Sequence, residues 1–284
     1  MKFFDDGQVT LHLGHVMDVL RELPSESVQC VVTSPPYWRQ RMYSDDPREI
    51  GREEHPDLWV AALVEVFSEV RRVASSDATF WLNVGDKFAA GGLGGGGMAS
   101  KRSNWRGTMG HVGLRKPPPG FKPKDLTLCA FELAKALRID GWYLRQTIIW
   151  SKGAAVEPPR LDRVATAHEY IFELSKSEDS IARNYDNVPW WHHSVWSISN
   201  DGSGEHVAQM PEELARRCIL IGSRPEDTVL DPFVGSGTTT RVARRLGRRS
   251  IGIDLNESYL RDIALKKNAQ MAMMPVMPVI EVPA

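Results

Sequence analysis

The stretch Thr228-Val229-Leu230-Asp231-Pro232-Phe233-Val234-Gly235-Ser236-Gly237-Thr238-Thr239 decides the fold class of this chain of 284 residues. Its first four residues predict a strand, and the glycines predict a tight loop behind it. We expect a helix at about residues 238–246, ended by Gly247, and a further strand at residues 249–255. This alternation is typical of a doubly wound, mainly parallel α/β sheet.

The same alternation extends through most of the chain. Apolar, β-rich runs predict strands at residues 28–33, 79–84, 143–150 and 168–174. Apolar positions at helical spacing predict helices at residues 57–73, 125–138 and 211–221. We expect Asp125 to cap the second of these helices and Pro211 to lie in the first turn of the third. These elements predict a sheet that is covered by helices.

The composition excludes several classes of protein. With 42% hydrophobic and 25% charged residues it is ordinary for a soluble globular protein, and no apolar run approaches the ~20 residues that span a bilayer. Cys30, Cys129 and Cys218 are odd in number and widely separated, which fits reduced thiols in a cytoplasmic protein and predicts no metal site. Because the net charge is −1, a nucleic-acid partner would have to meet a local basic patch.

Two stretches interrupt the pattern of strands and helices. Residues 88–124 hold ten glycines and seven Lys or Arg residues but no acid. Residues 176–206 are rich in aromatic residues and His and show little periodicity. We interpret both as insertions at the edge of the sheet, within a single domain that extends over residues 1–284.

The glycine-rich loop lies where a doubly wound sheet binds ligands, at the carboxyl end of a strand. Asp254 ends the next strand, where a carboxylate can accept hydrogen bonds from both hydroxyls of a ribose. The loop lacks the third glycine of a dinucleotide fingerprint and the Lys of a P-loop. A nucleoside without phosphate, such as S-adenosylmethionine, therefore fits better than NAD or ATP. The alternative is a tight glycine turn of no function. The predicted contacts are Asp231, Pro232, Phe233, Gly235, Ser236, Gly237, Thr238 and Asp254.

Ser34-Pro35-Pro36-Tyr37 follows the strand at residues 28–33 and is expected at the same edge of the sheet. Two prolines fix the backbone and remove two N–H donors, which leaves carbonyl groups facing outward. The exocyclic amine of cytosine or adenine is a poor nucleophile because its lone pair is delocalised into the ring. The Ser34 hydroxyl and the Pro35 carbonyl could accept its two N–H bonds, and Tyr37 could stack on a base flipped out of the duplex. The alternative is a Pro-Pro loop that only ends a strand.

In this order, the two motifs resemble those of the amino DNA methyltransferases, specifically the beta class, in which the catalytic half precedes the cofactor half. The resemblance covers most of the chain and extends to residues 81–86, 148–152, 162–170 and 206–214. It implies a seven-stranded, Rossmann-like sheet that binds S-adenosylmethionine, with His206 in a helix that helps to close over the methionine end of the cofactor. It also implies that the catalytic residues are Ser34, Pro35, Pro36 and Tyr37.

One position departs from the family pattern, and one feature indicates the target base. Members commonly carry Gly-Asp near the start, with the acid near the adenine of the cofactor, whereas this chain has Gly14-His15. Either Asp18 or another group takes over this contact, or the contact to the adenine is weaker; no role is assigned to His15. A tetrapeptide that begins with Ser resembles members that methylate cytosine N4 more than members that methylate adenine N6. We therefore expect cytosine N4 methylation within a specific sequence, with adenine N6 as the alternative.

Other functions fit this sequence less well. A methyltransferase that acts on a protein glutamine also has a Pro-Pro-Tyr loop, but usually after Asn and with the cofactor motif first. A DNA-binding protein that has lost catalysis is disfavoured by the intact Ser34, Tyr37, Asp231 and Asp254. The resemblance implies a cytoplasmic enzyme of bacterial or phage origin that acts on double-stranded DNA, with a restriction endonuclease for the same site as an expected partner. It leaves open whether the enzyme is a monomer or a homodimer.

Basic residues of the 88–124 insertion are the predicted contacts to DNA phosphates. A solvated flexible loop is the alternative. The 176–206 insertion occupies the place where this class usually carries its target-recognition region. The alternative is that its aromatic residues belong to the core, which is the role we expect for Trp190 and Trp196. Arg241, Arg244, Arg245, Arg248 and Arg249 are expected to form a solvated helix face. The predicted phosphate contacts are Lys101, Arg102, Arg106, Arg115 and Lys116, with Lys122 and Lys124 beside them.

Overall fold

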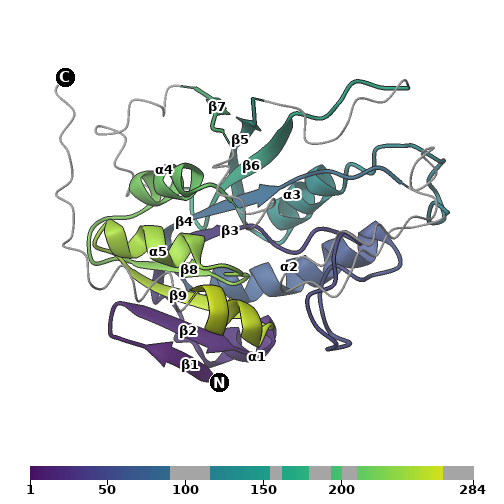
Figure 1. The fold of residues 1–284 in the computed structure, drawn as a ribbon. Coiled ribbons are helices and arrows are strands. Elements are labelled where there is room, and N and C mark those ends of the chain that lie inside the picture. The colour runs from purple at the N-terminus through teal and green to yellow at the C-terminus, as the bar shows by residue number, and fades with distance from the viewer. Residues whose placement is uncertain (90–115, 154–161, 179–192, 200–209, 265–284) are drawn as a thin grey trace.

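The computed structural model describes residues 1–89, 116–153, 162–178, 193–199 and 210–264 (Figure 1). Its strands are β1 (Lys2–Asp5), β2 (Val9–Leu13), β3 (Val28–Thr33), β4 (Ala74–Val84), β5 (Tyr143–Ser151), β6 (His168–Ser175), β7 (Val195–Ser197), β8 (Thr228–Asp231) and β9 (Arg249–Asp254). Its helices are α1 (Val16–Glu22), α2 (Pro56–Val73), α3 (Cys129–Ile139), α4 (Glu212–Gly222) and α5 (Thr238–Arg245), followed by a π-helical turn at Tyr259–Ala264.

All of these strands join one sheet in the order β1-β2-β9-β8-β3-β4-β6-β5-β7. Neighbours from β2 to β4 are parallel, whereas β6 runs antiparallel to both β4 and β5. The predicted doubly wound, mainly parallel sheet is confirmed. In the described residues the sheet has nine strands, two more than the resemblance implied. β1 pairs antiparallel with β2 at one edge and β7 pairs parallel with β5 at the other, and no residue range predicted β1, β2 or β7. The short β7 lies inside the 176–206 insertion.

Helices cover both faces of the sheet (Figure 1). α1, α2 and α3 pack on one face, where Leu63, Phe67 and Leu133 are fully buried. α4 and α5 pack on the other face, where they bury Cys218 and Val242. Because side chains of a strand alternate between the two faces, β4 sends Phe80 and Leu82 to the first core and Trp81 to the second. Among helices of the described ranges, none has both the length and the apolar character needed to cross a membrane.

Helix α3 begins later than predicted. Its N-cap is Leu128, which adopts a left-handed conformation with φ 56° and makes no side-chain cap bond. Asp125 instead accepts a hydrogen bond from the Lys122 amide (2.9 Å) and so closes a turn before the helix. The expected capping role of Asp125 is therefore wrong, because its carboxylate accepts from a backbone amide that precedes it and the helix is capped at Leu128. Pro211 is likewise the N-cap of α4 and not a residue of its first turn.

Two of the five arginines expected on a solvated face near α5 are buried, whereas Arg245 and Arg249 are exposed, as expected. Arg241 and Arg248 are buried, with 8% and 3% of their surface exposed. Arg241 donates to Glu212 of α4 (2.9 Å), and Arg248 donates to the Ser223 carbonyl (2.7 Å). These contacts fasten α5 and the strand behind it to α4, so these two arginines serve the packing of the second layer of helices.

Candidate active site

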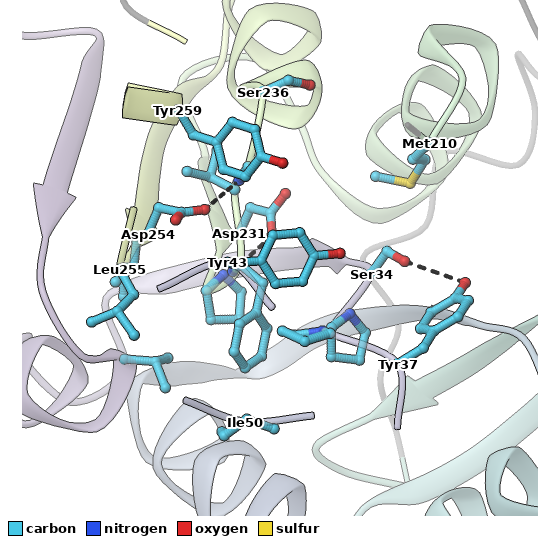
Figure 2. A pocket seen from close by; sticks show the side chains of 18 of the residues that line it. Ser34, Tyr37, Tyr43, Ile50, Met210, Asp231, Ser236, Asp254, Leu255 and Tyr259 are labelled. Carbon is cyan, nitrogen blue, oxygen red and sulfur yellow. Dashed lines mark hydrogen bonds between the residues drawn. The ribbon is translucent and has the colours of Figure 1, made fainter. Parts of the chain in front are cut away.

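The two predicted functional loops open at the same edge of the sheet. β3 and β8 are parallel neighbours, with Cys30 opposite Val229 and Val31 opposite Leu230. The Thr33 hydroxyl donates a 2.6 Å hydrogen bond to Asp231 and joins the ends of the two strands. Both loops line one cavity of about 460 Å³, seen in Figure 2. Its volume falls in the range typical of small-molecule sites.

Asp254 stands at one end of this cavity, as predicted. Its two carboxylate oxygens accept backbone N–H bonds from Gly235 (2.8 Å) and Asn256 (2.7 Å). An ionised carboxylate offers about four acceptor positions, so about two remain for the cavity. That remaining capacity matches two ribose hydroxyls. Burial raises the pKa of Asp254 to about 6.

Asp231 lies deeper, between the two loops, with 3% of its surface exposed. One of its oxygens accepts both the Thr33 hydroxyl and the Phe233 amide (3.1 Å). Burial raises its pKa to about 6. Gly235 and Gly237 have φ of 49° and 73°, in the left-handed region that favours glycine. The loop after β8 therefore turns tightly enough to bring its backbone against the cavity.

The other residues predicted to contact the cofactor differ in their position relative to the cavity. Pro232, Phe233, Ser236 and Thr238 line the cavity. Gly237 does not line it; it is the N-cap of α5 and shapes the loop. His206 lies outside the described residues.

The Ser34-Pro35-Pro36-Tyr37 loop is held in place from behind. Buried Trp59 of α2 donates its indole N–H to the Pro36 carbonyl (2.9 Å). The Ser34 hydroxyl lies 3.5 Å from the Tyr37 hydroxyl (Figure 2). The Tyr37 hydroxyl in turn donates to Glu169 at 2.7 Å. All four residues of the loop line the cavity, so the predicted catalytic residues and the predicted nucleoside site share one space.

Sequence reasoning assigned no role to several other residues of the cavity wall, four of which lie at or next to strand ends. These four are Asn83, Trp150, Lys152 and Glu169. Asn83 and Trp150 lie near the ends of β4 and β5, Lys152 follows β5, and Glu169 lies at the start of antiparallel β6. Strand ends at a ligand-binding edge carry functional side chains, so position in the sheet was the signal that could have found them.

His15, at the departure from the family pattern, also lines the cavity. It caps α1 by accepting from the Met17 amide, and its other ring nitrogen lies 3.2 Å from the Arg48 carbonyl. Asp18 does not take over the missing acid's place: it is exposed, does not line the cavity, and pairs with Arg48 at 2.9 Å. That ion pair lowers the pKa of Asp18.

The predicted DNA contacts are mostly outside the part of the chain that the structure describes. Lys101, Arg102, Arg106 and Arg115 are in that group, whereas Lys116 is described and exposed. Within the described ranges, no group of three or more His, Cys, Asp or Glu side chains could hold a metal ion.

Comparison with known proteins identifies the class. Residues 28–266 match the family model N6_N4_Mtase, described as a DNA methylase, and the chain therefore belongs to the amino DNA methyltransferases. It is 40% identical over 266 residues to the Type II methyltransferase M.Cfr9I of Citrobacter freundii, and the aligned region covers 91% of this chain and 87% of that protein. It is also 40% identical over 258 residues to M.SmaI of Serratia marcescens, covering 87% and 86% of the two chains.

Solved structures agree with the fold. TTHA0409 of Thermus thermophilus, a putative DNA modification methylase in complex with S-adenosyl-L-methionine, superposes with a TM-score of 0.65 and 26% identity, covering 92% of this chain and 93% of that one. The PvuII cytosine-N4-specific DNA methyltransferase superposes with a TM-score of 0.68 and 20% identity, covering 93% and 91%. The cofactor of this chain is S-adenosylmethionine, and its cavity fits that group through the spare acceptors of Asp254 and a loop without phosphate-binding character.

Proposed function

We propose that this enzyme methylates the N4 amino group of cytosine, within a specific sequence of double-stranded DNA. The observation that carries the proposal is Ser34, a hydroxyl on the wall of the cavity that also holds Asp254. Among the amino DNA methyltransferases, a tetrapeptide that begins with Ser resembles the members that act on cytosine N4. Site specificity is supported by the relatives, which are named Type II methyltransferases.

The proposed chemistry is activation of a weak nucleophile by hydrogen bonding. The N4 lone pair of cytosine is delocalised into the ring, so the nitrogen is nearly planar and unreactive. Ser34 Oγ and the Pro35 carbonyl would accept the two N–H bonds and draw the nitrogen toward tetrahedral geometry. When bound, S-adenosylmethionine supplies an activated methyl group, so much of the acceleration would come from positioning. The Asp254 carboxylate would hold the ribose of the cofactor.

The base has to leave the duplex to reach this cavity. Tyr37 would then stack on the flipped base. The hydrogen bond from Trp59 to the Pro36 carbonyl would keep the loop rigid during this contact. Because α2 buries Trp59 completely, the loop keeps its shape without the substrate. This preorganisation limits the entropy lost when the base binds.

Mass spectrometry of nucleosides is the direct test. DNA treated with the enzyme and the cofactor should yield N4-methylcytosine, whereas N6-methyladenine would overturn the choice of base. Ser34→Ala and Tyr37→Ala should lower turnover strongly and leave cofactor affinity nearly intact by calorimetry. Equal losses of turnover and cofactor affinity would contradict the catalytic assignment. Sequencing that maps the mark would give the recognition site.

The basic insertion at residues 88–124 would supply phosphate contacts, through Lys116 and the other Lys and Arg residues named above. Deleting part of residues 91–124 should weaken DNA binding and reduce its dependence on salt, since fewer counterions are released. An unchanged salt slope would remove this segment from the interface. We further propose that the enzyme works in the cytoplasm beside a restriction endonuclease for the same site, as the names of its relatives suggest.

A further inference from the structure

Glu169 and Lys152 form a largely buried ion pair on the wall of the cavity, beside the Ser34-Pro35-Pro36-Tyr37 loop. Their side chains are 16% and 7% exposed, and Lys152 Nζ contacts Glu169 Oε1. The ammonium also lies 4.5 Å from the centroid of the Trp150 ring. Burial of a carboxylate is costly unless the charge is paired, so this arrangement keeps a negative charge at a defined place in the wall.

The second oxygen of Glu169 accepts two further hydrogen bonds. The Tyr37 hydroxyl donates at 2.7 Å and Asn83 Nδ2 donates at 3.1 Å. Asn83 also donates to the Tyr170 carbonyl (3.2 Å), which fixes the orientation of its amide. Burial and the nearby charge of Glu169 raise the pKa of Tyr37 well above its ordinary value, so the phenol remains a donor.

This geometry sets the direction of the hydrogen bond between Ser34 and Tyr37. A phenol has a single hydrogen, and Tyr37 directs it to Glu169. The Tyr37 oxygen is therefore an acceptor toward Ser34, whose Oγ lies 3.5 Å away (Figure 2). With its hydrogen turned toward Tyr37, Ser34 keeps its lone pairs available for a donor in the cavity.

We propose that Glu169, held by Lys152 and Asn83, is a positioning residue that orients the Tyr37 and Ser34 hydroxyls so that Ser34 accepts a hydrogen bond from the target amino group. The inference rests on the catalytic assignment of Ser34 and Tyr37 made above. It holds for cytosine and adenine alike, because both amino groups present N–H donors. Without the carboxylate, Tyr37 can turn its hydrogen toward Ser34, whose own hydrogen then points at the amine.

The test is a double-mutant cycle between Glu169→Gln and Tyr37→Phe, with kcat on DNA as the readout. Glu169→Gln should lower kcat roughly 10- to 100-fold when Tyr37 is present, the value of one charge-assisted hydrogen bond. In the Tyr37→Phe background it should cost less than about twofold, because the chain of hydroxyls is already broken. Cofactor affinity should be unchanged in every variant. Glu132→Gln, which neutralises an exposed ion pair with Lys135, is the matched control and should leave kcat unchanged.

A second variant separates positioning from stability. In Lys152→Met with Glu169→Leu, both charges and the acceptor for Tyr37 are removed together, which avoids an unpaired buried charge and should largely preserve the melting temperature. Its kcat should remain as low as that of Glu169→Gln alone. Recovery of kcat would overturn the proposal, as would equal losses from Glu169→Gln in both backgrounds. If Ser34→Ala and Tyr37→Ala leave kcat unchanged, the catalytic assignment itself fails; if they lower it and Glu169→Gln does not, only the role of Glu169 fails.

Discussion

Asp254 offers a sharp test of how the protein holds its cofactor. Its pKa is raised by burial to about 6, and both of its oxygens accept backbone N–H bonds. If the ionised Asp254 carboxylate binds the ribose hydroxyls, affinity for S-adenosylmethionine is greatest well above pH 6 and decreases as the pH falls through that value. About half of the carboxyl is ionised at pH 6 and about a tenth at pH 5, so affinity for S-adenosylmethionine should fall about tenfold between pH 8 and pH 5.

Asp254→Asn should weaken binding even at pH 8. An amide has one acceptor oxygen, so it can satisfy only one of the Gly235 and Asn256 amides and turns its NH₂ toward the other. Loss of a charge-assisted hydrogen bond of about 1.5–3 kcal/mol predicts roughly a 10- to 100-fold lower affinity.

Calorimetry from pH 5 to pH 8 compares the wild type with Asp254→Asn. The variant should show a nearly flat profile. Asp231→Asn is the control, because Asp231 also has a pKa of about 6 but should leave the fall caused by Asp254 in place. A flat profile in the wild type would refute the reasoning, as would an undiminished fall in Asp254→Asn.

Three further outcomes follow from the packing around the site. The pKa of Asp231 rises from 3.8 to about 6 on folding, so its contribution to stability is complete below pH 3.8 and is lost as the pH rises through 6. This change lowers the free energy of unfolding by at most about 3 kcal/mol. In urea unfolding, the free energy of unfolding of Asp231→Asn should therefore decline less between pH 4 and pH 7 than that of the wild type. An equal decline in both proteins would assign the effect to another group. Gly222→Ala would place a methyl group 2.3 Å from the Thr79 hydroxyl in the core and should cost about 1–3 kcal/mol in the same assay, so a neutral result would contradict the packing of α4 on the sheet. Gly85→Ala would place a methyl group 3.1 Å from the Tyr37 ring. It should lower kcat several-fold and leave cofactor affinity unchanged. A wild-type kcat in steady-state kinetics would disprove this prediction.

Local pattern was sufficient for the elements with a strong periodic signal. The strand at residues 28–33 matches β3, and the strand that ends at Asp231 matches β8. Short elements with little apolar repeat escaped prediction, among them β1, β7 and α1. The start of α3 was misplaced because Asp125 accepts a hydrogen bond from the Lys122 amide in a turn before the helix. The spacing of apolar residues gives no information about such a turn. Arg241 and Arg248 were wrongly expected in solvent because their partners, Glu212 and Ser223, belong to the neighbouring helix and its end.

The sequence by itself determined the class of chemistry of this protein. A strand followed by Gly235-Ser236-Gly237, an acid at the end of the next strand, and Ser34-Pro35-Pro36-Tyr37 after an earlier strand are local arrangements that a linear pattern can express. Only the tertiary structure decided which side chains complete the cavity. Asn83 lies on β4, Glu169 on β6 and Lys152 just after β5, and these strands are neighbours in the order β4-β6-β5. Glu169 reaches the cavity because β6 runs antiparallel. Strand order and direction depend on how whole elements pack, so the contact between Glu169 and Tyr37 exists only in the folded sheet.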